Sequence, residues 1–245
     1  MKLKSLSFRK CFLTLLPFLF LISFHVDAKV SKGHRQLVVV SELKTFGQSN
    51  LSWLYSFLDA STVTVAVAKM SHAYRSIKII KGSKATKTRF VNVLNRYSKR
   101  NAISAIDVIL SLHGLSNELY FADGAVSTFD LRDDLKDNPK KYKYRLMYNL
   151  ACYGSSHRNE FRASGFKTVV GARRVNANSA FEYPFFLTHY GLGTMNVKTI
   201  IGFTNMHPSK LSYDFMAKTV GGFSDADSHK KISGVQNLKI NSNAF

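Results

Sequence analysis

The chain has 245 residues, of which 45% are hydrophobic and 20% charged, a composition typical of globular proteins and not of disordered ones. Its four prolines and fourteen glycines exclude collagen-like and proline-rich architectures, and its two cysteines exclude a disulfide scaffold and a four-cysteine zinc site. Lysine and arginine, 35 in all, outnumber the 15 acidic residues, so the formal net charge is +20.

Residues 1–28 have the pattern of a secretory signal peptide. A basic stretch precedes an apolar run at 11–24, and Val26-Asp27-Ala28 provides a tolerable cleavage site. The run is shorter than the roughly 20 residues of a membrane span, and no second run of that length is apparent. We therefore expect a soluble mature chain that begins near Lys29 and is exported, to the periplasm or outside the cell. A retained signal anchor is the alternative.

Cleavage would leave one cysteine. Loss of four basic residues and Asp27 lowers the net charge from +20 to +17, and Cys152 is then the only thiol. A lone cysteine in an exported protein is a buried apolar filler, an intermolecular bridge or a reactive group.

Strand-like and helical patterns alternate along the chain. Leu51, Leu54, Tyr55 and Leu58 have the i, i+3, i+4, i+7 spacing of an amphipathic helix. We interpret 63–68 as a strand, although it could extend that helix. The expected strands are 36–41, 63–68, 76–80, 107–112, 118–122, 125–129, 145–151 and 167–171. The expected helices are 50–60, 86–99, 129–137, 159–164, 178–190, 198–205 and 211–220.

This alternation predicts one α/β domain at about 34–220, with a mostly parallel sheet and helices on both faces. Asp123-Gly124 is a strong signal for a two-residue hairpin turn. Residues 221–245, rich in Gly, Ser, Asp and Asn, are expected to form a loose C-terminal tail.

Two predicted strands end in residues that can carry chemistry. His113-Gly114 follows one strand, and Cys152 follows another. In open α/β sheets, sites form beyond the carboxyl ends of the strands, and a right-handed crossover can place these two strands side by side. The Cys152 thiolate would then be a nucleophile, with His113 as acid/base. The N–H groups of Gly114 and Cys152 could form an oxyanion hole. Taken singly, a His-Gly pair is commonly a turn and a buried cysteine commonly a packing residue.

An apolar strand ending in His-Gly, followed by an apolar strand ending in Ala-Cys, resembles the pattern of caspase-like cysteine peptidases. That group includes caspases, clostripain, gingipains, legumain and bacterial CHAT domains. Segments 118–135 and 164–186 are similar to its hairpin-helix and its post-cysteine stretch, so the resemblance covers about 105–190. It implies a caspase-like fold and a polypeptide substrate. It also implies His113 as general acid/base, Cys152 as nucleophile and Gly114 as an oxyanion amide.

The resemblance departs from the caspase pattern at Leu150, which stands where caspases have a glutamine lining the specificity pocket. Arg173 and Arg174 follow a strand at the same predicted sheet edge and could clamp an acidic substrate side chain. Alternatively, Asp123 or Glu182 could hold a basic one, as the resemblance to clostripain suggests.

The other histidines lack the spacing of metal ligands, so no metal or cofactor is expected. We expect His157 to lie solvated in the loop after Cys152. The positive charge favours anionic partners such as lipopolysaccharide, lipid surfaces or acidic polypeptides, with solubility alone as the simpler explanation. A nucleic-acid module would need aromatics on an exposed sheet face. We therefore predict an exported cysteine endopeptidase; the alternatives are a non-catalytic basic binding protein on the same scaffold and an unrelated exported α/β protein. The sequence does not predict the oligomeric state.

Overall fold

A computed structural model describes residues 29–243 of the chain. The predicted signal peptide lies outside the described residues.

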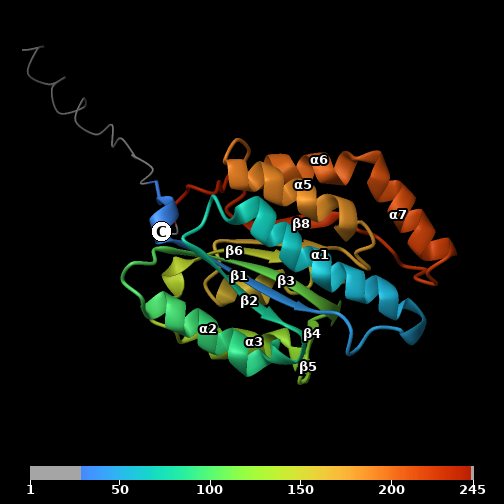
Figure 1. Ribbon diagram of the computed structural model, residues 1–245, viewed down its shortest axis with the longest axis horizontal. Coiled ribbons are helices and arrows are strands. Elements are labelled where there is room, and N and C mark those ends of the chain that lie inside the picture. Colours follow the sequence, from blue (N-terminus) through green and yellow to red (C-terminus); the bar gives the residue numbers. More distant parts are fainter. Residues whose placement is uncertain (1–28, 244–245) are drawn as a thin grey trace, which may run out of the picture.

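An eight-stranded sheet organises the fold (Figure 1). Its main path runs, in spatial order, through β2 (Ser76–Lys81), β1 (Arg35–Glu42), β3 (Ala105–Leu115), β6 (Tyr144–Asn149), β7 (Thr168–Ala172) and β8 (Lys230–Gly234). Neighbours on this path are parallel, except that β8 is antiparallel to β7. The hairpin of β4 (Glu118–Phe121) and β5 (Gly124–Ser127) pairs with the last residues of β3.

Helices cover both faces of this sheet. One face carries α2 (Lys87–Lys99), α3 (Thr128–Lys136) and α4 (Arg158–Ala163). The other carries α1 (Ser52–Met70), α5 (Ser179–Leu192) and α6 (Val197–Met206), and α7 (Pro208–Thr219) follows α6. Short 3-10 turns are η1 (Lys32–His34), η2 (Ser49–Leu51), η3 (Gly82–Lys84) and η4 (Lys141–Lys143).

Strand β1 shows why both faces are covered. Its side chains alternate between the two faces, as in any strand. Val38 and Val40 pack in the core beneath α2, whereas Leu37 and Val39 pack beneath α1 and α5. Such continuous apolar strands are typical of parallel sheets buried on both sides. The predicted α/β class and the helices on both faces are confirmed.

The predicted strand at 63–68 is wrong, because α1 continues through it to Met70. Its β-branched residues favour a strand locally, but Ala66 and Met70 are buried at helical spacing in the core shared with α5. With η2, this segment (Ser49–Met70) has the length and mean hydropathy, 1.3, of a membrane span, contrary to the expectation that no second run of that length occurs. In this fold it lies against the sheet and α5.

The predicted loose tail is also wrong. Residues 230–234 form β8, paired along its whole length with β7. Beyond it, Leu238 and Ile240 are buried in the same core as α5 and α6. The domain therefore extends past the predicted boundary at residue 220.

A buried ionic cluster ties this C-terminal segment to the sheet. The Arg145 side chain is fully buried and forms an ion pair with Asp107 on the neighbouring strand, with Nε 2.9 Å from Oδ1. Tyr74 donates to the same carboxylate. The guanidinium groups of Arg35 and Arg145 both donate to the carbonyl of Ile240, at 2.9 and 2.5 Å. These partners satisfy charges that would otherwise be costly to bury.

Candidate active site

His113 lies inside β3 rather than after it. The strand continues to Leu115, because its last three residues pair with β4, including His113 with Tyr120. The half-buried His113 ring donates from Nε2 to the carbonyl of Leu43, 2.7 Å away. A carbonyl oxygen can only accept, so Nε2 must carry the proton. In the neutral ring Nδ1 is then an unprotonated base.

Cys152 lies in the turn that follows β6, held by polar contacts on each side. The Asn149 side chain accepts from the N–H of Ala151 at 3.0 Å, and the Asn176 side chain donates to the carbonyl of Leu150 at 2.8 Å. The backbone of Tyr153 donates to the carbonyl of Arg174. Both ends of the turn are thus anchored to the rest of the sheet edge.

Gly114 allows two segments of the site, the end of β3 and the cysteine turn after β6, to approach each other. We call these two segments the arms of the site. A Cβ at this position would lie 2.7 Å from the carbonyl oxygen of Cys152 and 3.0 Å from the Ala151 side chain. No real Cβ tolerates the first distance. The end of β3 and the cysteine turn can therefore come this close only with glycine at position 114.

His157 also joins the two arms, contrary to the expectation that it is solvated. It is fully buried, and its Nε2 donates to the carbonyl of Leu115 at 2.8 Å. Its Nδ1 accepts from the side-chain amide of Asn149 at 2.9 Å. Burial lowers the pKa of His157 to about 4, so the ring is neutral. Its predicted position was wrong because a polar loop sequence does not show that the loop turns back onto β3.

The cavity beside these residues is largely apolar. It has a volume of about 690 Å³, and His113 and Cys152 both line it. Its walls come from α1 between Trp53 and Val65, the start of α5, the second half of α7 and the segment Val175–Ala177. Among the residues that the structure describes, no aspartate, glutamate, lysine or arginine lines it.

Burial raises the pKa of the Cys152 thiol, while the backbone N–H of Asn176 and the charge of Lys230 act in the opposite direction. Lys230 is itself buried and paired with Glu182, 2.9 Å away. The resting thiol is therefore protonated at neutral pH.

Tyr55 also belongs to the site, although the sequence pattern does not predict it there. Its ring meets the His113 ring edge-on, with centroids 4.8 Å apart. Its pKa is raised, mainly by burial and in part by the neighbouring Cys152. Helical spacing identified Tyr55 only as an apolar face residue, and no local signal marks it as a partner of His113.

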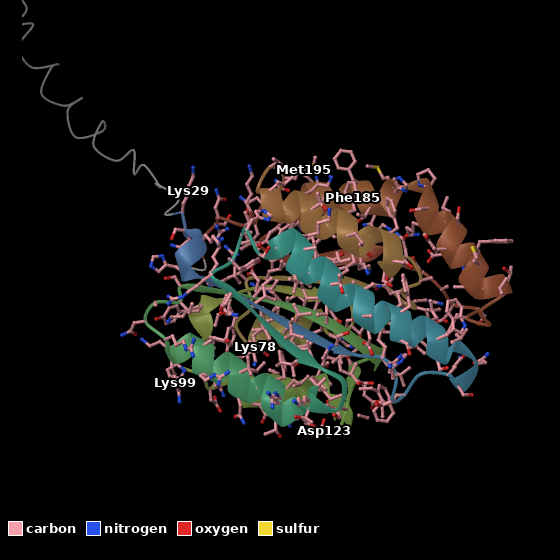
Figure 2. All side chains as sticks on the ribbon, in the orientation of Figure 1. Lys29, Lys78, Lys99, Asp123, Phe185 and Met195 are labelled. Carbon is pink, nitrogen blue, oxygen red and sulfur yellow. The ribbon has the colours of Figure 1, made fainter. Side chains whose placement is uncertain are left out.

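The structure does not bring the predicted specificity residues into this cavity. Arg173 is half exposed and lies 3.4 Å from Asp227, and Arg174 is exposed. The backbone N–H groups of Arg173 and Arg174 donate to the carbonyls of His229 and Asp227. The next residues along the chain, Val175–Ala177, line the cavity instead. Asp123 lies in the β4–β5 turn (Figure 2), where its carboxylate accepts from the N–H of Lys87.

Glu182, the alternative specificity residue, is occupied by Lys230 and does not line the cavity either. No group of three or more histidine, cysteine or acidic residues suited to a metal ion occurs within 29–243.

No family model matches the chain, and no curated protein matches it in sequence. Solved structures do match: caspase-1 from Spodoptera frugiperda is similar over 87% of this chain and 94% of that one, with a TM-score of 0.56 and 12% identity. At this identity the likeness shows the fold alone. The chain has the caspase-like fold, as the resemblance implied.

Proposed function

We propose that the chain is a cysteine endopeptidase with Cys152 as nucleophile and His113 as general acid/base. The observation that carries the proposal is that both side chains line one cavity, His113 from β3 and Cys152 from the turn after the neighbouring parallel strand β6. The caspase-like fold supports it at the level of architecture.

The protonation states of His113 and Cys152 fit the roles of base and nucleophile. His113 Nδ1 is free to take the Cys152 proton as Sγ attacks the substrate carbonyl carbon. The same proton then passes to the leaving amine, which departs as the carbonyl re-forms and a thioester remains. Water hydrolyses the thioester, with Nδ1 again as base, and restores the thiol. The N–H groups of Gly114 and Cys152 are proposed to stabilise the oxyanion.

The bound side chain of the substrate is proposed to be apolar. A charged side chain in this cavity would lose its hydration without meeting an opposite charge, which is unfavourable by several kcal/mol or more. This replaces both the acidic preference expected from Arg173 and Arg174 and the alternative basic preference expected from Asp123 or Glu182.

We also propose that the chain is exported after cleavage near Lys29. The support is the pattern of residues 1–28 alone. Mass measurement of the mature protein should show a chain that starts near Lys29; a protein that retains 1–28 contradicts the proposal.

Turnover of a mixed-sequence peptide library tests the peptidase. Cys152→Ala should abolish cleavage, and His113→Gln should lower kcat at least about 100-fold. His34→Gln, in an exposed histidine away from the cavity, is the matched control and should leave cleavage unchanged. Absence of turnover by the unmodified chain, together with no labelling of Cys152 by a peptidyl acyloxymethyl ketone, would favour the non-catalytic binding protein.

A further inference from the structure

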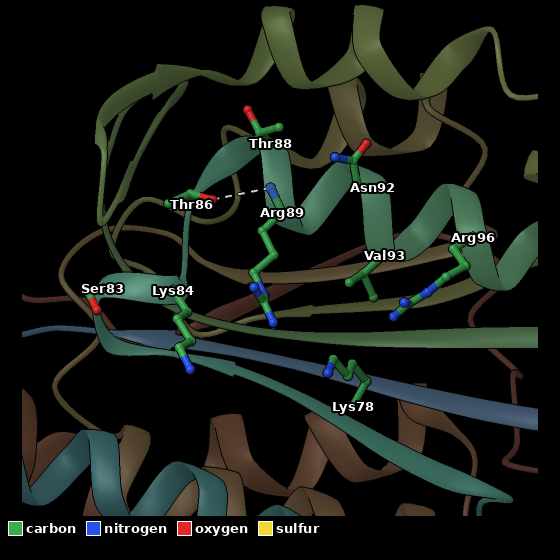
Figure 3. A pocket seen from close by; sticks show the side chains of 9 residues that line it. All are labelled: Lys78, Ser83, Lys84, Thr86, Thr88, Arg89, Asn92, Val93 and Arg96. Carbon is green, nitrogen blue, oxygen red and sulfur yellow. Dashed lines mark hydrogen bonds between the residues drawn. The ribbon is translucent and has the colours of Figure 1, made fainter.

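A second hollow lies on the other face of the sheet from the candidate active site and gathers basic side chains. It has a volume of about 600 Å³ and lies between the edge strand β2 and helix α2. Lys78, Lys84, Arg89 and Arg96 line it, from β2, η3 and α2. In Figure 3 the Arg89 and Arg96 side chains extend from α2 towards β2, and the Lys78 side chain extends from β2 towards them; Lys84 lies beside them at the η3 end of the strand. We call these four residues the basic hollow.

These four charges lack acidic partners. Within residues 29–243 no ion pair involves any of them, and no aspartate or glutamate lines the hollow. The neighbouring Lys87, in contrast, is paired with Asp134 at 2.8 Å. Like charges gathered in one concave space repel one another, so an anion that enters it relieves this repulsion.

We propose that the basic hollow binds a small compound that carries two or more phosphate groups. The guanidinium groups of the two arginines can each donate two hydrogen bonds to phosphate oxygens. The ammonium groups of the two lysines add positive charge. The Ser83 hydroxyl lies at the same rim. The volume is in the usual range of small-molecule sites and exceeds the needs of a single phosphate ion.

The lining distinguishes this ligand from two other anions. Membrane-surface segments typically combine cations with exposed apolar side chains that enter the lipid, and no exposed large hydrophobic residue lines the hollow. Single-stranded nucleic acid needs aromatic rings for stacking, and no aromatic residue lines it either. Both statements concern the described part of the chain.

Calorimetric titration of the whole protein at low salt tests the proposal, with sodium tripolyphosphate as the probe. We expect saturable binding with one site per chain, at least tenfold weaker binding of orthophosphate, and weakening as salt is added. Lys78→Gln with Arg89→Gln should weaken tripolyphosphate binding at least tenfold. Lys198→Gln with Lys218→Gln removes the same charge from exposed positions outside the hollow and should change it less than twofold.

Arg89→Lys keeps the charge but removes the planar donor fork, and it should give an intermediate loss. Equal weakening by both double variants would mean that net charge alone attracts the probe, which overturns the site. Non-saturable binding overturns it as well. Vesicles of phosphatidic acid and phosphatidylcholine distinguish the source of the phosphate: binding to the anionic vesicles without binding of tripolyphosphate would assign a membrane surface instead.

Discussion

The protonation of each residue of the proposed dyad depends on a different feature of the fold. His113 is oriented by one main-chain carbonyl, that of Leu43, so its tautomer depends on the position of the 43–48 loop. Cys152 is controlled by burial, which favours the neutral thiol. The thiol must therefore lose its proton as it attacks, which makes the free Nδ1 of His113 essential to the proposed mechanism.

Alkylation of Cys152 by iodoacetamide should show its raised pKa. In a chain that begins at Lys29, Cys152 is the only thiol, and the rate should keep rising above pH 9 instead of levelling off near the ordinary cysteine value. The same chain unfolded in urea is the control and should behave as an ordinary thiol. A plateau below pH 8 in the folded chain would show that the site activates the thiolate at rest.

His157 should make stability depend on pH. Its folded pKa of about 4 lies below the ordinary value of 6.5, so only the unfolded chain gains a proton between these values. The free energy of unfolding is therefore unaffected by the titration of this group above pH 6.5. It falls by about 2–4 kcal/mol as the pH is lowered towards 4. Urea unfolding at pH 7 and 4.5 measures it. His157→Gln should remove this part of the pH dependence, and an unchanged profile would contradict the burial of a neutral ring.

At the scale of elements, the sequence predicts strands and helices correctly where the hydrophobic periodicity and the length of the segment indicate the same element. It predicts β3 and β6, and it predicts that these two strands are neighbours, so that their carboxyl ends lie together. Helix α1 was cut short because Val63, Val65 and Val67 favour a strand locally, whereas packing on α5 determines the outcome. The cavity walls were not predictable, since they combine α1, α5 and α7, which are distant in sequence.

The walls contributed by α1 and α5 set the expected substrate preference. Ala180 lines the cavity at the start of α5 and is exposed, so a longer side chain can be accommodated there. Ala180→Lys should lower cleavage of peptides with apolar side chains and raise that of acidic ones, each at least tenfold. Ala60→Lys, on α1 but outside the lining, should leave both unchanged. A library cut by the unmodified chain after charged residues would refute the apolar preference and leave the peptidase intact.

At the scale of the whole molecule, the two faces of the sheet carry hollows of different character, one apolar and one basic. The apolar cavity lies on the face of α1 and α5, and the basic hollow lies on the face of α2. No lysine or arginine within the described residues lines the apolar cavity, whereas four line the basic hollow. A protein with both features could bind a polyphosphate and a peptide at the same time, without competition between them.

The C-terminal segment should be required for stability of the whole domain. Leu238 and Ile240 are buried, and the Ile240 carbonyl accepts from two buried guanidinium groups that would otherwise lose a partner. Leu238→Ala with Ile240→Ala should lower the free energy of unfolding by at least about 4 kcal/mol, since each such truncation costs about 2–5 kcal/mol. Gln236→Ala with Lys239→Ala, at exposed positions of the same segment, is the control and should cost less than about 1 kcal/mol. Urea unfolding measures both, and equal, small losses would mean that the segment is a loose tail after all.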